Sequence, residues 1–346
     1  MLGARHVRVA TLTAAIALTA RTALLGQAQP AQPAVSIGGV VYAQYYYHVS
    51  DTADRANNFD VTRTYLNVTG RLADGLATRV TADIYRNADG SAVYRLKYAY
   101  AAYTPGGSPL TFKLGLIHTA LLDWEEALWD YRMQGTMPLE RGGYVSSADF
   151  GAGVDGRWGG ELVNVQVAVV NGENYNQTPG DQGKDFQGRA SVRLLSSDDA
   201  SRVGGLRLTG YAQLGTPTTG GTRNRFLGMV SYKSSLRTLA AEAGFTRTAV
   251  GTPTPAATNG RVIAAYGVYR FPGTRAALVG RVDLTDPNTS VTGDRATRII
   301  LGVSYQLTPN LRLLGDLDNV SYETTPTNAA LYAARSQALL QMQFTF

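Results

Sequence analysis

Residues 335–346 read RSQALLQMQFTF, and this stretch decides the fold. The apolar positions are Ala338, Leu340, Met342, Phe344 and Phe346, and they alternate with Gln337, Leu339, Gln341, Gln343 and Thr345. Successive side chains of a β-strand point to opposite faces, so this period of two predicts a strand with one apolar and one more polar face. Its length is close to the 9–11 residues, roughly, with which a tilted strand crosses a bilayer.

The same alternation recurs along the chain from Val35, and no helical stripe of more than two turns interrupts it convincingly. In one such run, Val163, Val165 and Val167 alternate with Asn164 and Gln166. We predict sixteen strands, at residues 35–48, 59–72, 76–87, 93–103, 110–117, 148–158, 161–171, 185–195, 205–215, 223–233, 237–247, 261–271, 275–285, 295–307, 310–322 and 335–346.

The connections between these runs alternate between short and long. The short ones include residues 73–75, 159–160, 271–274 and 308–310, and the long ones include 50–58, 118–147, 172–184, 248–260 and 323–334. Short periplasmic turns and longer extracellular loops are typical of a transmembrane β-barrel.

The length of the runs favours a membrane barrel over a soluble β-sandwich, whose strands commonly have about 5–6 residues. An open sheet edge is not tolerated in lipid, so the strands must close on each other. Closure with both termini on one side needs an even strand number, and sixteen satisfies this condition. Fourteen and eighteen strands satisfy it too and are the alternatives. The expected fold is an all-β transmembrane antiparallel barrel of about sixteen strands around an aqueous lumen.

The composition excludes several other classes of protein. Charged residues make up 17% of the chain, against about 25% in soluble proteins, and there is no cysteine. After the N-terminus no apolar stretch reaches the roughly 20 residues of a membrane-spanning helix. The formal charge of +6 falls to +3 without residues 1–28, which contain three arginines and no acid. With no nucleic-acid-binding motif, a nucleic-acid partner is not expected.

The N-terminus has the pattern of a targeting segment. Arg5 and Arg8 lie in a short basic region, and Val9 to Ala20 is an apolar run that is too short to span a membrane. We therefore predict a cleavable signal peptide, which implies export and is consistent with the bacterial outer membrane. An amphipathic N-terminal helix is the other interpretation, because Arg21 lies inside the segment.

The expected cleavage site follows Ala28, because Gly26 and Ala28 are small residues at the two positions that a signal peptidase reads. Cleavage after Ala31 or Ala34 is the alternative. Residues 1–28 would then be the signal peptide, residues 29–34 a short leader, and residues 35–346 a single barrel.

The chain ends in an aromatic residue, Phe346, on the apolar face of the last predicted strand. This ending resembles the signal by which outer-membrane proteins are recognised, so the assembly machinery and membrane lipid are expected partners. Tyr45–Tyr47 and the group Tyr98, Tyr100 and Tyr103 are expected near strand ends, where aromatic girdles form.

No combination of residues predicts an enzyme. Apart from His6 in the signal segment, the only histidines are His48 and His118, and no pair has the spacing of metal ligands. We expect no catalytic residue, no metal and no cofactor, and we expect both histidines at junctions between strands and loops.

Basic residues dominate the face that is predicted to line the lumen. They are Arg63, Arg71, Arg79, Arg95, Lys97, Lys113, Arg157, Arg189, Arg193, Arg207, Arg225, Lys233, Arg281, Arg298 and Arg312. The acids on the same face are Asp83, Asp155, Glu242, Asp283, Asp316 and Asp318.

Guanidinium groups suit carboxylate and phosphate oxygens, and basic rings in a pore favour anions. A unit charge at contact range in water is worth only about 1 kcal/mol, so we expect a preference for small anions and not an exclusion of cations. The alternative is that many of these arginines pair with acids of the loops and hold the loops in place.

The longest connection, residues 118–147, contains the only short helical pattern of the chain. Its sequence is Asp123-Trp124-Glu125-Glu126-Ala127-Leu128-Trp129-Asp130-Tyr131-Arg132. Helical spacing places Trp124, Leu128 and Tyr131 on one face, with Glu126 and Asp130 beside them. A loop of this kind is not expected to stay in solvent, so we predict that it folds into the lumen. The constriction would then be formed by Asp123, Trp124, Glu125, Glu126, Trp129, Asp130 and Arg132. A loop that covers a subunit interface is the alternative.

Several segments resemble a known family. The pattern W-E-E-x-x-W-x-Y-R at 124–132, Ser146–Asp149, Val169–Tyr175 and Gly183–Gln187 are similar to the phosphate-selective porin O and P family of bacterial outer membranes. The resemblance implies a sixteen-stranded channel that forms a homotrimer. Phosphate-selective members carry a lysine cluster in the constriction, whereas this chain has four lysines, of which only Lys97 and Lys113 fall near that region.

The sequence therefore predicts an outer-membrane porin for passive diffusion of small hydrophilic solutes. A structural or adhesive barrel whose lumen is plugged by its loops is the alternative, and conductance separates the two.

Overall fold

The computed structural model describes residues 34–87, 89–177, 182–217, 220–251 and 256–346. The predicted signal peptide, and the leader except Ala34, lie outside the described residues. No helix of the described residues is long and apolar enough to cross a membrane.

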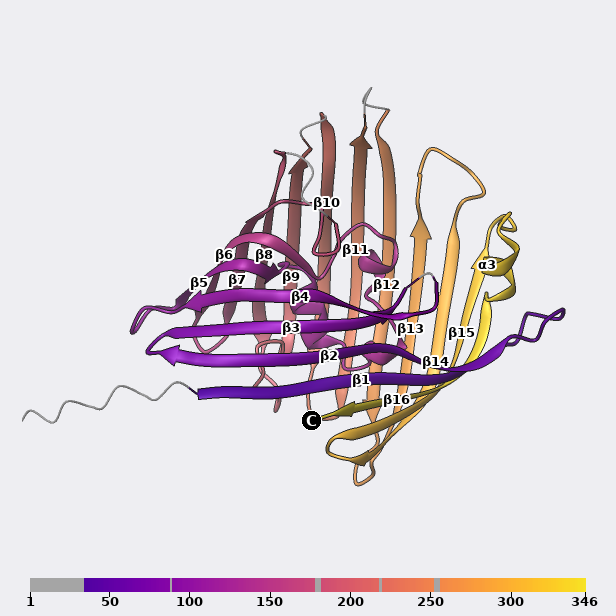
Figure 1. Ribbon diagram of the computed structural model, residues 1–346, viewed down its shortest axis with the longest axis horizontal. Helices are drawn as coiled ribbons and strands as arrows, with labels where there is room; N and C mark the ends of the chain where they lie inside the picture. Colours follow the sequence, from indigo (N-terminus) through magenta and orange to yellow (C-terminus); the bar gives the residue numbers. More distant parts are fainter. Residues whose placement is uncertain (1–33, 88, 178–181, 218–219, 252–255) are drawn as a thin grey trace, which may run out of the picture. The chain divides into compact units, whose positions relative to one another are not determined.

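Sixteen strands form the described fold, in agreement with the predicted number (Figure 1). The strands are β1 (Ala34–His48), β2 (Asn57–Ala73), β3 (Leu76–Arg86), β4 (Ala92–Tyr103), β5 (Leu110–His118), β6 (Ala148–Trp158), β7 (Val163–Val170), β8 (Lys184–Leu195), β9 (Gly205–Thr216), β10 (Gly221–Lys233), β11 (Arg237–Val250), β12 (Thr258–Arg270), β13 (Ala276–Asp286), β14 (Ala296–Thr308), β15 (Leu311–Tyr322) and β16 (Ser336–Thr345). Three short α-helices and one 3₁₀ turn complete it: α1 (Leu122–Leu128), η1 (Arg132–Gln134), α2 (Pro138–Arg141) and α3 (Ala329–Ala333).

Each strand pairs with its neighbours in sequence, and β1 pairs antiparallel with β16, so the sheet is a closed barrel. Val40 lies opposite Thr345, and His48 lies opposite Gln337. The predicted all-β antiparallel barrel is confirmed. Most strand bounds lie within a few residues of the predicted ones; β2, for example, begins at Asn57 instead of residue 59.

The two ends of the barrel differ in their connections. One end carries Ala34, Phe346 and the connections 74–75, 104–109, 159–162, 196–204, 234–236, 271–275 and 309–310. The other end carries the connections 49–56, 87–91, 119–147, 171–183, 217–220, 251–257, 287–295 and 323–335. Because outer-membrane barrels have short periplasmic turns and longer extracellular loops, the first end is the periplasmic one.

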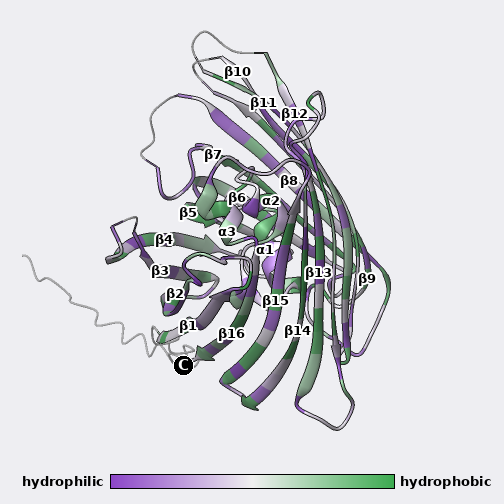
Figure 2. Ribbon diagram, turned by 90° about the vertical axis from the view of Figure 1, so that its right-hand side faces the viewer, coloured by the Kyte–Doolittle hydropathy of each residue, from purple (hydrophilic) through white to green (hydrophobic). Residues whose placement is uncertain are grey.

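Hydrophilic and hydrophobic residues alternate along the strands (Figure 2), and many of the exposed side chains on the strands are large and apolar. Leu114 is 68% exposed, Leu317 60% and Leu340 57%, while their neighbours in sequence turn inward. An apolar face of this kind, on strands that close without a free edge, is suited to lipid. The barrel is therefore an outer-membrane barrel.

A β-bulge in β4 changes the direction of two side chains. Thr81 of β3 pairs with Tyr98 and Ala82 pairs with Leu96, so Lys97 is an extra residue in the ladder. An extra residue breaks the alternation of faces. Tyr98 is buried and its ring stacks on His118 at 3.8 Å, so Tyr98 belongs to the interior and not to an interfacial girdle.

Candidate functional site

The connection 119–147, called loop 3 below, lies inside the barrel against one part of its wall (Figure 2). Trp124, Leu128, Trp129 and Leu139 are buried in one apolar cluster. The wall contributes inward-facing apolar side chains to this cluster from β9 to β13 and from β15, namely Tyr211, Leu227, Met229, Ala240, Val262, Tyr266, Val268, Ala277, Val279 and Leu314. Apolar burial therefore determines which side of the lumen loop 3 occupies.

Basic and amide side chains of the wall hold the backbone of loop 3. Its carbonyls need donors, because an unpaired carbonyl that is buried costs free energy. The donor–acceptor pairs are Arg189 Nε to Ala120 O (3.1 Å), Lys233 Nζ to Ala127 O (3.1 Å), Arg312 Nη1 to Asp130 O (2.8 Å), Gln341 Nε2 to Met133 O (2.9 Å), Arg281 Nη1 to Thr136 O (2.8 Å) and Arg225 Nε to Tyr144 O (3.0 Å).

Two aspartates of loop 3 form ion pairs with the barrel. Asp130 pairs with Lys233 at 2.9 Å and also with Arg270. Asp123 accepts from Arg202 Nη1 at 2.6 Å, and Arg202 lies in the periplasmic turn 196–204. Burial raises the pKa of Asp123, but the Arg202 guanidinium and the other basic groups nearby together lower it more, so the pKa lies well below its usual range. Loop 3 thus has charged anchors on the strands and on a turn.

The part of the wall that loop 3 leaves uncovered carries a cluster of positive charge on β2, β3 and β4. Arg63 and Arg95 share one acid, Asp83, at 3.0 and 2.8 Å. Lys97 Nζ donates to the Tyr65 hydroxyl at 3.1 Å. Arg79 donates to Asn67 at 2.7 Å. Within the described residues, neither Arg79 nor Lys97 has a carboxylate within ion-pair distance.

Tyrosine rings surround the ammonium group of Lys97. It lies 4.5 Å from the centroid of Tyr65, 5.5 Å from Tyr98 and 6.0 Å from Tyr175. Tyr175 comes from the outer loop 171–183, and its hydroxyl accepts from Arg95 at 2.8 Å. Ring faces attract cations, so this arrangement stabilises the charge of Lys97 without a carboxylate.

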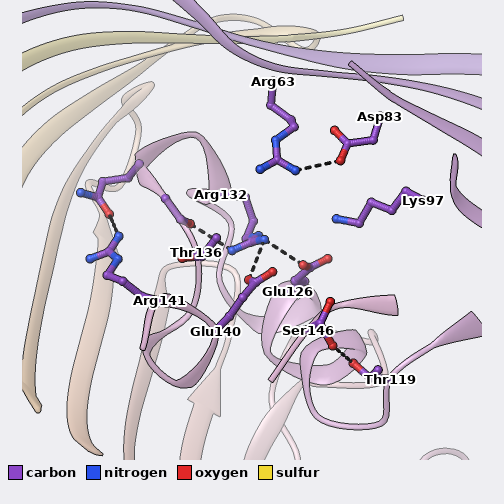
Figure 3. Close-up of polar contacts among 12 residues, drawn as sticks. Arg63, Asp83, Lys97, Thr119, Glu126, Arg132, Thr136, Glu140, Arg141 and Ser146 are labelled. Carbon is purple, nitrogen blue, oxygen red and sulfur yellow. Dashed lines mark hydrogen bonds and ion pairs between the residues drawn. The ribbon is translucent and has the colours of Figure 1, made fainter. Parts of the chain in front are cut away.

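The lumen side of loop 3 carries charges of both signs. Arg132 Nη2 contacts Glu126 at 2.9 Å and Glu140 at 3.1 Å, and Arg63 and Lys97 lie across from them (Figure 3). Burial raises the pKa of Glu126, but Arg132 and Lys97 lower it more, and the carboxylate form is favoured. Two acids and one arginine therefore face a wall with an excess of cations.

Two cavities adjoin this region. One of about 940 Å³ lies towards the periplasmic end, where its lining includes Ala34, Gly75, Arg79 and Lys113. The other, of about 270 Å³, lies between loop 3 and the wall and is lined by Tyr42, Arg63, Arg132 and other mostly polar residues. Both are of a size that suits small hydrophilic solutes.

The structure distributes the predicted lumen residues between two roles. Arg63 and Arg79 line the cavities of the uncovered side, and Lys113 does so in an ion pair with Asp155. Arg95 shares Asp83 with Arg63, and Lys97, which is 3% exposed, lies inside the barrel among tyrosine rings. Most of the others serve as structural contacts: Arg189, Arg225, Lys233, Arg281 and Arg312 on loop 3, Arg207 on the carbonyl of Glu161, Arg193 on the carbonyl of Gly160, Arg157 on Glu161 and Arg298 on Asp318. The sequence interpretation in which arginines hold the loops agrees with Arg189, Arg281 and Arg312, but they bind carbonyls of loop 3 and not the loop acids that were expected.

The residues of the predicted constriction fall into three groups with different positions. Glu126 and Arg132 lie on the lumen side of loop 3. Trp124, Glu125 and Trp129 are fully buried towards the wall. Asp123 and Asp130 act as anchors.

Three residues of the site were not identified from the sequence. Arg202 belongs to a turn and Arg270 to the end of a strand, where a lumen contact is not expected. Tyr175 lies in a quoted motif, Val169–Tyr175, but its position against Lys97 depends on the path of the outer loop. Alternation alone gives no signal for any of the three.

No protein-family model matches this chain, and no curated protein matches it. Solved structures match it in fold. An anion-selective porin from Comamonas acidovorans has a TM-score of 0.67 at 12% identity, over 91% of this chain and 100% of that one. OmpF of Salmonella typhi, in complex with daunomycin, has a TM-score of 0.63 at 13% identity, over 90% of this chain and 97% of that one. The outer membrane channel DcaP of Acinetobacter baumannii has a TM-score of 0.61 at 13% identity, over 91% of this chain and 98% of that one. This chain has the fold of bacterial outer-membrane porins.

Proposed function

We propose that the protein is a porin, a water-filled channel through which small hydrophilic solutes, preferably anions, diffuse passively across the outer membrane. The fold, the apolar outer face and the polar cavities beside loop 3 support this proposal. Loop 3 packs on one part of the wall, which favours an open lumen over a barrel that its loops plug.

The observation that carries the anion preference is a pair of cations, Arg79 and Lys97, that have no acid partner among the described residues. Together with Arg63, Arg95 and Lys113 they give the uncovered wall five positive charges against two acids, Asp83 and Asp155. Charges that are paired within the wall contribute little to the potential in the lumen, whereas these contribute most. One of the structural relatives is described as an anion-selective porin, in agreement with this preference.

The channel claim is tested with purified, folded barrel in planar bilayers and in liposomes. We expect discrete conductance steps in KCl and swelling of the liposomes in small sugars. Heat-unfolded protein at the same concentration is the control for detergent effects. A folded barrel that gives neither conductance nor swelling would support the structural or adhesive alternative.

We propose further that the channel is related to the phosphate-selective porin O and P family but passes phosphate as one anion among several. Lys97 is the only lysine of the uncovered cluster, and Lys113 is neutralised by Asp155. Phosphate added to a chloride current tests this. We expect little inhibition at about 1 mM, a concentration that corresponds to about −4 kcal/mol of binding. Half-maximal block well below that concentration would indicate a phosphate-selective site.

A homotrimer is proposed from the same resemblance. Cross-linking of the folded protein, followed by electrophoresis without heating, should give a product with three times the mass of the monomer. A single monomer band under conditions that cross-link a known trimeric porin would contradict it.

A further inference from the structure

Two carboxyl groups meet where loop 3 touches the barrel wall. Glu125 of α1 and Glu242 of β11 are 0% and 4% exposed, and their carboxyl groups lie close enough for each to act on the other. The Tyr266 hydroxyl of β12 lies against Glu242. None of the four carboxyl oxygens, nor the Tyr266 hydroxyl, has a hydrogen-bond partner among the described residues.

In the part of the chain that the structure describes, no free cation compensates the two carboxyl groups. The nearest guanidinium, that of Arg281, uses Nε and Nη2 for Asp283 at 2.8 and 2.7 Å and Nη1 for the carbonyl of Thr136 at 2.8 Å. The titratable groups that face the pair are Tyr211 of β9, Tyr266 of β12, Arg281 and Asp283 of β13, and Glu140 of α2.

Two carboxylates in contact at a buried site cannot both be ionised without a large cost, so one of them keeps a proton. Burial and the neighbouring Glu242 raise the pKa of Glu125 well above the usual carboxyl range. A metal ion is a poorer occupant, because Ca²⁺ needs about six to eight oxygen ligands and this site supplies at most five.

We propose that Glu125 and Glu242 share one proton and that this carboxyl–carboxylate pair is a pH-dependent latch between loop 3 and the barrel wall. At acid and neutral pH the shared proton holds α1 on β11. At alkaline pH the proton passes to solvent hydroxide, two carboxylates remain, and their repulsion separates α1 from the wall.

The direction of the movement follows from the architecture. Behind Glu242 the wall is a hydrogen-bonded sheet, in which β11 pairs with both β10 and β12. Loop 3 can therefore move only towards the lumen, which narrows it. The stabilisation by the latch is complete at low pH and is lost as the pH rises through the raised pKa of Glu125.

Intrinsic fluorescence tests the latch without reference to transport. The chain has three tryptophans: Trp124 and Trp129 lie in loop 3, and Trp158 lies on the outer face. Trp129 contacts Tyr266 at 5.3 Å between ring centroids. In a Trp158→Phe variant in detergent, we expect the emission to move to longer wavelength as the pH rises from about 5 to about 10. Emission that is unchanged over this range would overturn the proposal.

Glu125→Gln and Glu242→Gln, each made in the Trp158→Phe background, assign the effect to the pair. In either variant one amide donates to the remaining carboxylate at every pH, so the spectral shift should disappear. Glu323→Gln, at an exposed acid of an outer loop, is the matched control and should keep it. A shift that persists in both pair variants would overturn the assignment, and either variant suffices if the other does not fold.

Channel recordings test the consequence for the pore, which rests on the proposed function. Wild-type conductance should fall at alkaline pH, and the conductance of Glu242→Gln should not. A spectral shift in a barrel that never conducts would refute the channel but leave the latch intact. A conducting channel with no shift and no alkaline fall would refute the latch alone.

Discussion

Phe346 closes the barrel against Gly39. The two residues exchange backbone hydrogen bonds of 2.9 and 3.1 Å, and the Phe346 ring occupies the space in which a Cβ on Gly39 would lie. A Cβ there would come within 2.5 Å of the ring and 2.7 Å of the Tyr65 carbonyl. The first and last strands therefore fit together because Gly39 has no side chain and the ring of Phe346 fills the space that this leaves.

Gly39→Val should impair barrel closure, because the added side chain displaces the Phe346 ring and meets the backbone of β2. Deletion of Phe346 should impair it as well, through the loss of the terminal contact and of the proposed assembly signal. The fraction of heat-modifiable, protease-resistant barrel in isolated membranes measures both. Gly228→Val is the matched control, since open space surrounds that glycine. Equal yields for all variants would show that the contact is dispensable.

Gly244→Val should loosen loop 3 without preventing closure of the barrel. Leu139 of α2 packs over Gly244, and a Cβ there would come within 2.8 Å of its side chain. We expect normal assembly with increased current noise and a changed conductance, because α2 is pushed towards the lumen. A channel with wild-type conductance and noise would show that α2 adjusts without moving the loop.

The ion pair between Asp123 and Arg202 should persist in mild acid. Arg202 and the other basic groups nearby together keep the pKa of Asp123 well below its usual range, although burial raises it. A depressed pKa gives stability that is present above the unfolded value of about 3.9 and is lost as the pH falls through the folded value. Asp123→Asn should therefore lower the midpoint of thermal unfolding by a constant amount from neutral pH to about pH 4, with a smaller difference only below that. A difference that already shrinks near pH 5 would contradict this.

The barrel could be predicted from the sequence because lipid and water impose a strict alternation on each strand. The run from Ala338 to Phe346 shows this clearly, and the register between β1 and β16 places its polar residues inward. The same logic placed Arg63, Arg79 and Arg95 on the lumen face. Alternation fails at the bulge, where Lys97 and Tyr98 are adjacent in sequence and both belong to the interior.

The partners of the lumen residues could not be predicted, because they depend on contacts between distant segments. Arg281 and Arg79 look alike in the sequence, yet Arg281 is committed to Asp283 and to the backbone of loop 3. Arg79 contacts only neutral groups and His118. The apolar part of the lumen wall was also not expected. Side chains such as Val262 and Val279 are apolar because loop 3 packs on them, and this contact cannot be seen in the sequence of a single strand.

The central claim is that the charges of Arg79 and Lys97 are unpaired and give the channel its selectivity, and the reversal potential in a KCl gradient tests it most directly. Wild-type channels should prefer chloride, with a preference that shrinks at high salt, since the Debye length falls from about 10 Å at 0.1 M to about 3 Å at 1 M. Lys97→Gln combined with Arg79→Gln should shift the reversal potential towards cation preference. Arg237→Gln, which removes one exposed positive charge at the start of β11, should leave it unchanged. A wild-type channel that already prefers potassium and does not respond to the double substitution would contradict the account.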